Sequence, residues 1–407
     1  GPEREPFTDP RVLVPEPSGS GLGLISASRS RTPKPKTMFT RYAPLALLFF
    51  PMLASAQTTH WGMSSSGGEH GIGTIWKITE AGTFTRTHDF FRNEGGNPKC
   101  ELVKYSGNGK LYGVTELGGV NGDGTIFSYD ASTGVYTMVA EFANATTGSH
   151  PLRGLTVSGT KLYGTCSQGG ASSNGTLFEF NPVTNAVVKK VDFGGTGAGA
   201  AATGTSPRGR LVLASNGLMY GTTFGGGTAS GIPSIGRGTI FSYSPGATAV
   251  TKVFSMVQAT GQNPSAGLMR PSAGTILYGV TFSGGANGFG VVYSFNTTGN
   301  VYADVHDLTA AEGKNPVGEL VQSGSLYYGT CSTGGASNLG TLFSFNPTGA
   351  VYTKLHDMAV ATGFEPVGRL MLAANGLLYG QTNRGSTNDD GVIFSFNTTG
   401  NVYTNLV

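Results

Sequence analysis

Leu111-Tyr112-Gly113 decides the fold, because the same three-residue stretch returns along the whole chain. It recurs unchanged at residues 162–164, 277–279 and 378–380. It recurs as variants at 219–221 and 327–329, with a degenerate copy at Trp61-Gly62. The glycines stand at 62, 113, 164, 221, 279, 329 and 380, a nearly constant period. A period of this size is typical of propellers, in which one repeat forms one four-stranded blade.

Three further elements keep phase with this period. The first is a Pro followed four residues later by Leu, at 98/102, 151/155, 207/211, 264/268, 316/320 and 366/370. The second resembles Gly-Thr-Ile-Phe and begins at 73, 124, 175, 238, 290, 340 and 391; the third is a Val-Tyr-Thr run, as in 351–357. Short β-branched or aromatic runs bounded by Gly, Asn and Pro are typical of strands.

The four elements predict four strands per repeat, named here strand a (after Pro), b (Leu-Tyr-Gly), c (Gly-Thr-Ile-Phe) and d (Val-Tyr-Thr). One such sheet cannot bury both of its faces, whereas seven arranged radially can. We therefore expect an all-β fold over residues 57–407, a seven-bladed β-propeller of four-stranded antiparallel blades.

Strand a occurs only six times, because the first repeat begins at strand b. The first blade is therefore predicted to be incomplete. A further Pro–Leu strand after Val407 would complete it, so we expect the sequence to be truncated.

The combination of Leu-Tyr-Gly-Thr-Thr, Gly-Gly, Gly-Thr-Ile-Phe and an aromatic–Asn-Pro segment resembles the Gloeo/Verruco (GloVer) tandem repeat of exported bacterial proteins. The resemblance covers residues 60 to 407. It implies an extracellular location and no established activity. The order of the elements is also similar, more loosely, to NHL-type propeller blades.

The N-terminal region carries a secretion signal. Residues 38–56 read MFTRYAPLALLFFPMLASA, with a basic Arg41, an apolar core and a small-residue end, which is typical of a signal peptide cleaved before Gln57. The core is too short for a membrane anchor. Residues 1–37 are rich in Pro and Ser and are predicted to be a disordered extension that does not belong to the native protein. The mature protein is predicted to be secreted.

The charge balance excludes some partners. Residues 1–56 contain seven Lys/Arg and four Asp/Glu, so the rest of the chain contains 19 of each and is formally neutral. Without a basic stripe, nucleic acid is not an expected partner, and without a later apolar stretch, no membrane span is expected. We expect a monomer without a cofactor.

The three cysteines predict neither a disulfide nor a metal site. Cys166 and Cys331 occupy the same position of strand b in repeats three apart, beyond disulfide reach around a ring. Together with Cys100, they are interpreted as small buried apolar residues. A reactive thiol or a metal site is the alternative, which no His/Cys spacing supports.

Two features suggest chemistry. His88-Asp89, His306-Asp307 and His356-Asp357 could act as acid–base pairs, but neighbours in a strand point to opposite faces, so we expect each Asp to bond a turn or a neighbouring blade. Loops 121–124 and 388–391 carry Asp123, Asp389 and Asp390, which are weak candidates for calcium ligands. Asp and Asn are also the usual residues of turns.

The tyrosine of strand b could form an exposed ring for sugar stacking, but packing between blades is the favoured interpretation. A better indication of function comes from the loops. The b–c and d–a connections emerge on one face of a propeller, and the two longest repeats carry their insertions there, at 194–206 and 225–237. Insertions on one face of a repeat protein often mark its binding face.

The sequence therefore predicts a secreted, non-catalytic binding or surface-display module for an extracellular glycan or protein. The alternative is an extracellular enzyme that acts on polysaccharide with a site at the channel mouth, and a third possibility is a purely structural surface-layer or adhesion repeat. Candidate binding residues on the b–c and d–a face are Glu69, His70, Arg92, Glu94, Glu116, Asp123, His150, Arg237, Arg384, Asp389 and Asp390.

Overall fold

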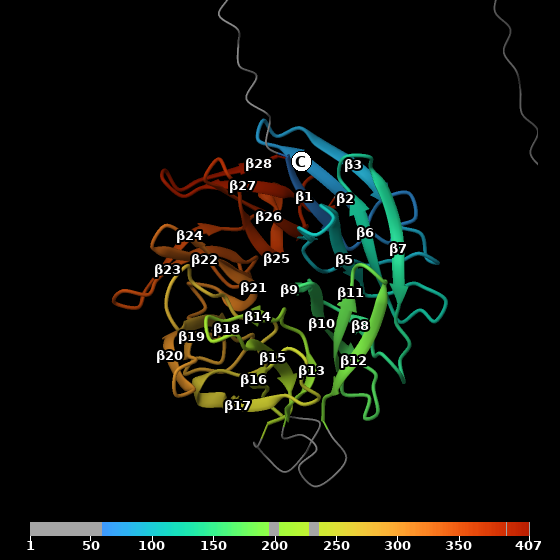
Figure 1. Ribbon diagram of the computed structural model, residues 1–407. Coiled ribbons are helices and arrows are strands. Elements are labelled where there is room, and N and C mark those ends of the chain that lie inside the picture. The colour runs from blue at the N-terminus through green and yellow to red at the C-terminus, as the bar shows by residue number, and fades with distance from the viewer. Residues whose placement is uncertain (1–58, 195–202, 228–235, 388, 407) are drawn as a thin grey trace, which may run out of the picture. The chain divides into compact units, whose positions relative to one another are not determined.

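The computed structural model describes residues 59–194, 203–227, 236–387 and 389–406, so the predicted extension and signal peptide lie outside the described residues. The described residues form seven antiparallel sheets arranged radially, in chain order, around a common centre (Figure 1). The predicted seven-bladed β-propeller is confirmed.

Strands b, c and d are present in every blade. Strand b is β1 (Thr59–Ser64), β5 (Leu111–Thr115), β10 (Lys161–Gln168), β15 (Met219–Gly225), β18 (Ile276–Val280), β22 (Leu326–Thr333) and β26 (Leu377–Arg384). Strand c is β2 (Thr74–Thr79), β6 (Thr125–Asp130), β11 (Thr176–Asn181), β16 (Thr239–Tyr243), β19 (Val291–Asn296), β23 (Thr341–Asn346) and β27 (Ile393–Asn397). Strand d is β3 (Phe84–Asp89), β7 (Val135–Glu141), β12 (Ala186–Asp192), β17 (Thr251–Ser255), β20 (Val301–Asp307), β24 (Val351–Asp357) and β28 (Val402–Asn405).

The innermost strand a is less regular than predicted. It is β4 (Val103–Lys104), the pair β8 (Ser149–Pro151) and β9 (Thr156–Ser158), the pair β13 (Thr205–Pro207) and β14 (Val212–Leu213), β21 (Lys314–Ser323) and β25 (Phe364–Leu372). In the fifth blade only isolated bridges mark it, at Gln262↔Ser283 and Met269↔Tyr278. The blades therefore contain three to five strands, because strand a is split in blades 3 and 4 and reduced to bridges in blade 5.

Strand a is irregular because it contains a bulge after its proline. In β21 the pairing jumps from Val317↔Thr330 to Val321↔Tyr328, so three residues face only Gly329. The bulge places Leu320 over that glycine, where an ideal Cβ would lie 2.9 Å from the Leu320 Cδ2 atom. Residues of the bulge leave the ladder and approach the centre of the ring.

The first blade has three strands in the described residues, in the order β1-β2-β3, as the strand count predicted. It packs on the seventh blade through a small cluster of buried side chains: Trp76, Ile78, Ala373 and Tyr379. Apolar side chains therefore join the first and last blades.

The tyrosine of Leu-Tyr-Gly packs between blades, as predicted. The Tyr112 ring lies 5.8 Å from Phe180 of the next blade, and the Tyr220 ring lies 5.9 Å from Phe295. Trp61 takes the same place in blade 1, 5.2 Å from Tyr129. Such tilted aromatic contacts add to the burial of apolar area, so these rings stabilise the contact between neighbouring blades.

Two single-turn 3₁₀ helices are described in full, η3 (Gln258–Thr260) and η4 (Val360–Thr362), and each lies in a d–a connection. No helix of the described part is long and apolar enough to cross a bilayer. The cysteines are free, and Cys166 and Cys331 are buried. Burial raises the pKa of the Cys331 thiol to about 12, which fits the expected packing role.

Candidate functional site

A cavity of about 940 Å³ opens among the innermost segments of the propeller. Residues of strand a from blades 2 to 7 line it, together with β1 of blade 1. The labels of β9, β14, β21 and β25 mark this central region in Figure 1. A concave site of this size is in the range that binds small molecules.

The charged side chains that line the cavity are mostly basic. They are Lys99, Arg153, Arg208, Arg270 and Arg369 against Glu101 and Glu116. This excess of basic side chains is local, because the chain after residue 56 contains equal numbers of basic and acidic residues. A low-dielectric wall strengthens such a local field, so the cavity favours an anion.

Arg153 and Arg208 are two basic side chains without a carboxylate partner among the described residues. They lie at the end of strand a that faces the b–c and d–a loops. Arg153 donates to two carbonyls, those of Arg208 at 3.3 Å and Ser265 at 3.2 Å. Arg208 lies 4.0 Å from the Phe224 ring centre and donates to the Ser206 hydroxyl at 3.4 Å. Neither guanidinium has a carboxylate within 4.0 Å in the described part of the chain.

Arg208 is affected by burial and by the charge of Arg153. Burial lowers the pKa of Arg208, and the nearby charge of Arg153 lowers it further, against a smaller opposite effect of Glu116. Two like charges close together disfavour each other's charged form. An anion placed between them would relieve that cost.

Deeper in the ring, Glu319 is fully engaged by basic groups. Arg210 donates to it with a 2.9 Å contact from Nη2 to Oε2, and Arg369 lies 3.8 Å away. Burial alone would raise the pKa of Glu319, but Arg210 and Arg369 together lower it below its ordinary value. This buried cluster joins strand a of blades 4, 6 and 7 and holds the channel wall in place.

Glu116 is the only predicted binding residue that lines the cavity. It accepts from Asn97 and forms an ion pair with Lys99 at 2.8 Å. It therefore places one carboxylate at the mouth, close to the Arg208 side.

The other predicted binding residues lie in different blades and are not brought together. They are Glu69, His70, Arg92 and Glu94 in blade 1 and its link to blade 2, Asp123 and His150 around blade 2, Arg237 in blade 4, and Arg384, Asp389 and Asp390 in blade 7. His70 lies 4.2 Å from Phe91, and Arg237 bonds Gln262 and Gln258. These contacts are local, and none of these residues lines the central cavity with Glu116. Their role in binding stays a prediction.

The calcium candidates are engaged in turns. The Asp123 carboxylate accepts from the Asn144 amide at 2.8 Å. Asp389 accepts from Arg384 and from the Gly385 amide, and Arg384 lowers the pKa of Asp389. Within the ranges that the structure describes, no three His, Cys, Asp or Glu side chains are grouped to hold a metal ion.

The two insertions of the loop face adjoin one another at their described bases. Thr205 pairs with Gly225, and an ideal Cβ on Gly226 would lie 2.6 Å from Gly204. Their inner parts, 195–202 and 228–235, lie outside the described residues. The predicted adjacency is confirmed for the bases, on the side of the ring that carries Arg208.

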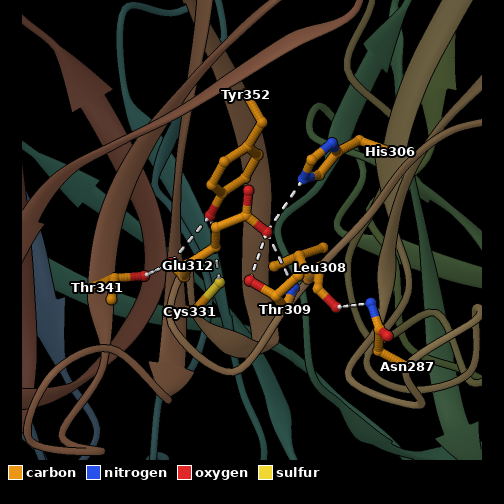
Figure 2. A network of polar contacts seen from close by, with 8 residues as sticks. All are labelled: Asn287, His306, Leu308, Thr309, Glu312, Cys331, Thr341 and Tyr352. Atoms are coloured by element: carbon orange, nitrogen blue, oxygen red, sulfur yellow. Dashed lines mark hydrogen bonds and ion pairs between the residues drawn. The ribbon is translucent and has the colours of Figure 1, made fainter.

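The histidines of strand d form a network at the blade boundaries, which Figure 2 shows for blades 5 and 6. His306 stacks on Tyr352 with ring centres 4.6 Å apart, and its Nε2 lies 3.3 Å from Glu312. Glu312 also accepts from the Thr309 amide and hydroxyl, and its backbone oxygen accepts from Tyr352 and Thr341. The network ties strand d to the d–a loop and to the next blade.

The same arrangement recurs at the boundary of blades 1 and 2. His88 stacks on Tyr136 at 4.1 Å, and its Nε2 lies 3.0 Å from Glu94. The neighbouring Asp residues bond b–c turns, as Asp357 does with the Ala336 amide. Repetition supports the predicted structural role of Asp, whereas the stacking of His on Tyr was not predicted. Glu94 belongs to this network.

We expect these histidines to make the fold sensitive to acid. Burial lowers the pKa of His88, against an opposite effect of Glu94, and burial also lowers that of His356. Both are neutral in the fold, so the unfolded chain takes up protons first as the pH falls below about 6.5, and stability is lost. Urea unfolding at pH 7.5 and 5.5 should show a smaller pH dependence in the double variant His88→Gln/His356→Gln. An unchanged dependence would contradict this.

Asp304 occupies a position at which a lysine forms an ion pair in other blades. We therefore expect its replacement by Lys to stabilise the fold. In blades 3 and 6 the equivalent residue is Lys, as in Lys354–Asp357 at 2.9 Å. In blade 5, burial and then Asp307 raise the pKa of Asp304 to about 6. Asp304→Lys should stabilise the fold by about 1 kcal/mol at pH 7.5, and by less at pH 5, where Asp304 is protonated. Thermal unfolding at both pH values checks this, and a lower midpoint at pH 7.5 would refute it.

The channel arginines were not predicted, because the candidate binding residues were expected in loops and not in strand a. The signal was present in strand a. The three residues after its proline carry charge in some repeats and are apolar or glycine in others, as Arg208 against Val317 and Arg153 against Gly318 show. Residues of strand a that differ between repeats therefore indicated the position of the cavity better than the lengths of the loops did.

Solved structures with a similar fold include two proposed 6-phosphogluconolactonases. That of Bacteroides uniformis is 16% identical with a TM-score of 0.56 over 86% of this chain and 95% of its own, and that of Bacteroides fragilis is 17% identical with 0.57 over 87% and 95%. The extracellular domain of a proposed hybrid two-component system of B. thetaiotaomicron is 11% identical with a TM-score of 0.53 over 82% and 38%. At these identities the likeness shows the fold alone. No curated protein matches the sequence.

The sequence itself matches a family model twice. The Gloeobacter/Verrucomicrobia repeat covers residues 50–233 and 226–407. These matches span nearly all of the propeller and agree with the resemblance carried by Leu-Tyr-Gly and Gly-Thr-Ile-Phe. The chain belongs to the Gloeobacter/Verrucomicrobia repeat family.

Proposed function

We propose that this protein is a secreted, non-catalytic binding module whose central cavity holds the carboxylate of an acidic extracellular saccharide. The observation that carries the proposal is that Arg153 and Arg208 both line the cavity, that Arg153 donates to the Arg208 carbonyl, and that neither has a carboxylate within 4.0 Å among the described residues. Guanidinium groups bind carboxylates through paired charge-assisted hydrogen bonds.

The rest of the lining suits a saccharide. The mouth also presents hydroxyl and amide groups from Gln168, Ser206 and Asn383, which can bond sugar hydroxyls. A cavity of about 940 Å³ accommodates a few sugar units, whereas a folded protein surface could reach only its rim.

Binding without catalysis is supported by the state of the carboxylates. Basic neighbours lower the pKa of Glu319 and so keep it ionised, unable to donate a proton near neutral pH. Glu116 is held by Lys99 and Asn97. Secretion is supported by the signal-peptide pattern of residues 38–56 and by the exported character that the family resemblance implies.

Calorimetry of the full chain with trigalacturonate and with its neutral methyl ester tests the proposal. We expect the acid to bind, the ester not to bind, and the affinity for the acid to fall as salt rises, because mobile ions screen the charges. Equal binding of both compounds, or binding of neither, would refute the proposal. Release of shortened saccharide during the titration would favour the alternative, an enzyme that acts on polysaccharide.

A further inference from the structure

We infer that the ring of Phe91, which lies against His70 in the loops of blade 1, is a stacking subsite for a further sugar unit of the acidic saccharide. The inference rests on the proposed function, because it gives a place to the part of a longer saccharide that leaves the central cavity. The ligand is then an oligouronate that extends from the cavity to blade 1. We call His70 and Phe91 the aromatic platform.

Phe91 is exposed in a protein that buries its other aromatic rings. It is 45% exposed, which is the largest exposed fraction of any Phe, Tyr or Trp in the part of the chain that the structure describes. A phenyl ring left in water forgoes the free energy of burial. Packing of the core therefore does not account for this side chain.

The repeat does not require an aromatic residue at this position. Phe91 follows the buried Phe90, whose amide donates to the Gly73 carbonyl at 3.1 Å, and the same backbone bond marks the equivalent position in blades 2 to 6. The residues found there are Ala143, Gly194, Val257, Thr309 and Ala359. Because none of these is aromatic, the fold of the d–a connection does not depend on a ring, and Phe91 is an addition specific to blade 1.

His70 supports the platform from a second loop. At the equivalent position of the b–c loop, Asn121 and Asn287 donate to a backbone carbonyl at the start of the following d–a connection, at 3.3 and 3.0 Å. His70 replaces this Asn in blade 1, and its ring packs on Phe91 with the centres 4.2 Å apart and the planes tilted by 43°. Protein thus orients the Phe91 ring while the side chain stays exposed, which suits stacking on a second flat apolar surface.

The platform lies on the same face as the cavity mouth and is joined to it by one short segment. The Phe91 carbonyl accepts from the Gly95 amide at 3.0 Å, and Gly96 exchanges two backbone bonds with the exposed Leu117. Pro98, seven residues after Phe91, lines the cavity. Since a chain spans at most about 3.5 Å per residue, the platform lies no more than about 25 Å from the lining. We expect a saccharide longer than the units held in the cavity to reach it.

Polar side chains beside the platform suit a uronate. Glu69 precedes His70, Arg92 and Asn93 follow Phe91, and all three are exposed. Carboxylate and amide groups bond sugar hydroxyls, and the guanidinium can pair with a second uronate carboxylate. A protein partner fits less well, because a stable protein interface takes about 20–30 residues a side, whereas the platform consists of two rings with charged neighbours.

Calorimetry of the full chain with hexagalacturonate and trigalacturonate tests the subsite. We expect the hexasaccharide to bind more tightly than the trisaccharide. Phe91→Ala should weaken binding of the hexasaccharide roughly threefold to tenfold and leave that of the trisaccharide unchanged, because only the longer ligand reaches the ring. Val257→Ala is the matched control, since Val257 occupies the equivalent position in blade 4, is 41% exposed, and should affect neither affinity.

A second variant locates the contact. Phe91→Trp keeps a ring at the platform and should retain the affinity for the hexasaccharide. The wild-type chain has two tryptophans of its own, so the difference in emission between the variant and the wild type isolates the added indole. This difference should change when the hexasaccharide is added and stay constant with the trisaccharide.

The outcomes separate the subsite from the proposed function. Equal affinities of the hexasaccharide for the wild type and Phe91→Ala, or equal losses in Phe91→Ala and Val257→Ala, would overturn the subsite. Absence of hexasaccharide binding would also overturn it and leave the platform to a protein partner. Binding that Phe91→Ala weakens and Arg208→Gln does not would keep the subsite and refute the proposed site in the cavity.

Discussion

Gly164→Ala will destabilise the propeller by about 1–3 kcal/mol, and Gly164→Val by more, although both changes add only methyl groups. Gly164 is the glycine of Leu-Tyr-Gly in blade 3. An ideal Cβ there would lie 2.5 Å from Phe178 Cζ and 3.0 Å from Leu155 Cδ2. Both side chains are fully buried, so neither can move aside without disturbing the core.

Urea unfolding of the two variants measures the effect, and Gly400→Ala is the matched control. An ideal Cβ at Gly400 would meet only Val402 Cγ2 at 3.4 Å, so this change should alter stability by less than about 0.5 kcal/mol. Combining Gly164→Ala with Phe178→Leu should cost less than the sum of the single changes, because the smaller side chain vacates the contact. Additive costs would show that close packing of Gly164 on Phe178 is not the reason for the glycine.

Arg208→Gln will weaken binding of the acidic saccharide by roughly tenfold to a hundredfold. Hydrogen bonds to charged groups contribute about 1.5–3 kcal/mol, and each 1.4 kcal/mol corresponds to a factor of ten. The fold should not lose stability through the removed charge, because burial and Arg153 already lower the pKa of Arg208. The unfolding midpoint therefore separates a binding defect from a folding defect.

Glu116→Gln at the same mouth should have the opposite effect on binding. Removing this carboxylate frees Lys99 and reduces repulsion, so affinity for the acid should rise about two- to fivefold, corresponding to roughly 0.5–1 kcal/mol. Arg86→Gln is the control: Arg86 is a half-exposed strand-d residue paired with Asp89, away from the cavity. If Arg86→Gln and Arg208→Gln lowered the affinity for the acid equally, the effect would be a general one of charge, and the proposed binding site would be wrong.

Much of the fold could be predicted, because each sequence element recurs in equivalent blades and takes the same structural position in each. Tyr112 and Tyr220 were expected between blades, and they pack there. The three strands of blade 1 followed from counting strands. The bulge of strand a could not be predicted, because it depends on how Leu320 reaches across Gly329, a contact between two strands.

The candidate site was harder to predict, since the useful residues depart from the repeat. Glu116 was identified from its place in a loop, whereas Arg153 and Arg208 were not, because their strand was expected to be regular. The stacking of His88 on Tyr136 joins two repeats, and periodicity within one repeat does not reveal it. Contacts that cross the ring or the blade boundary were the ones that sequence pattern left open.

A structure of the full chain with trigalacturonate will show whether Arg153 and Arg208 bind an acidic group. We expect one carboxylate of the saccharide between the guanidiniums of Arg153 and Arg208, with the rest of the ligand toward the b–c and d–a mouth. A saccharide bound on the outer strands, or an empty cavity at saturating ligand, would contradict it.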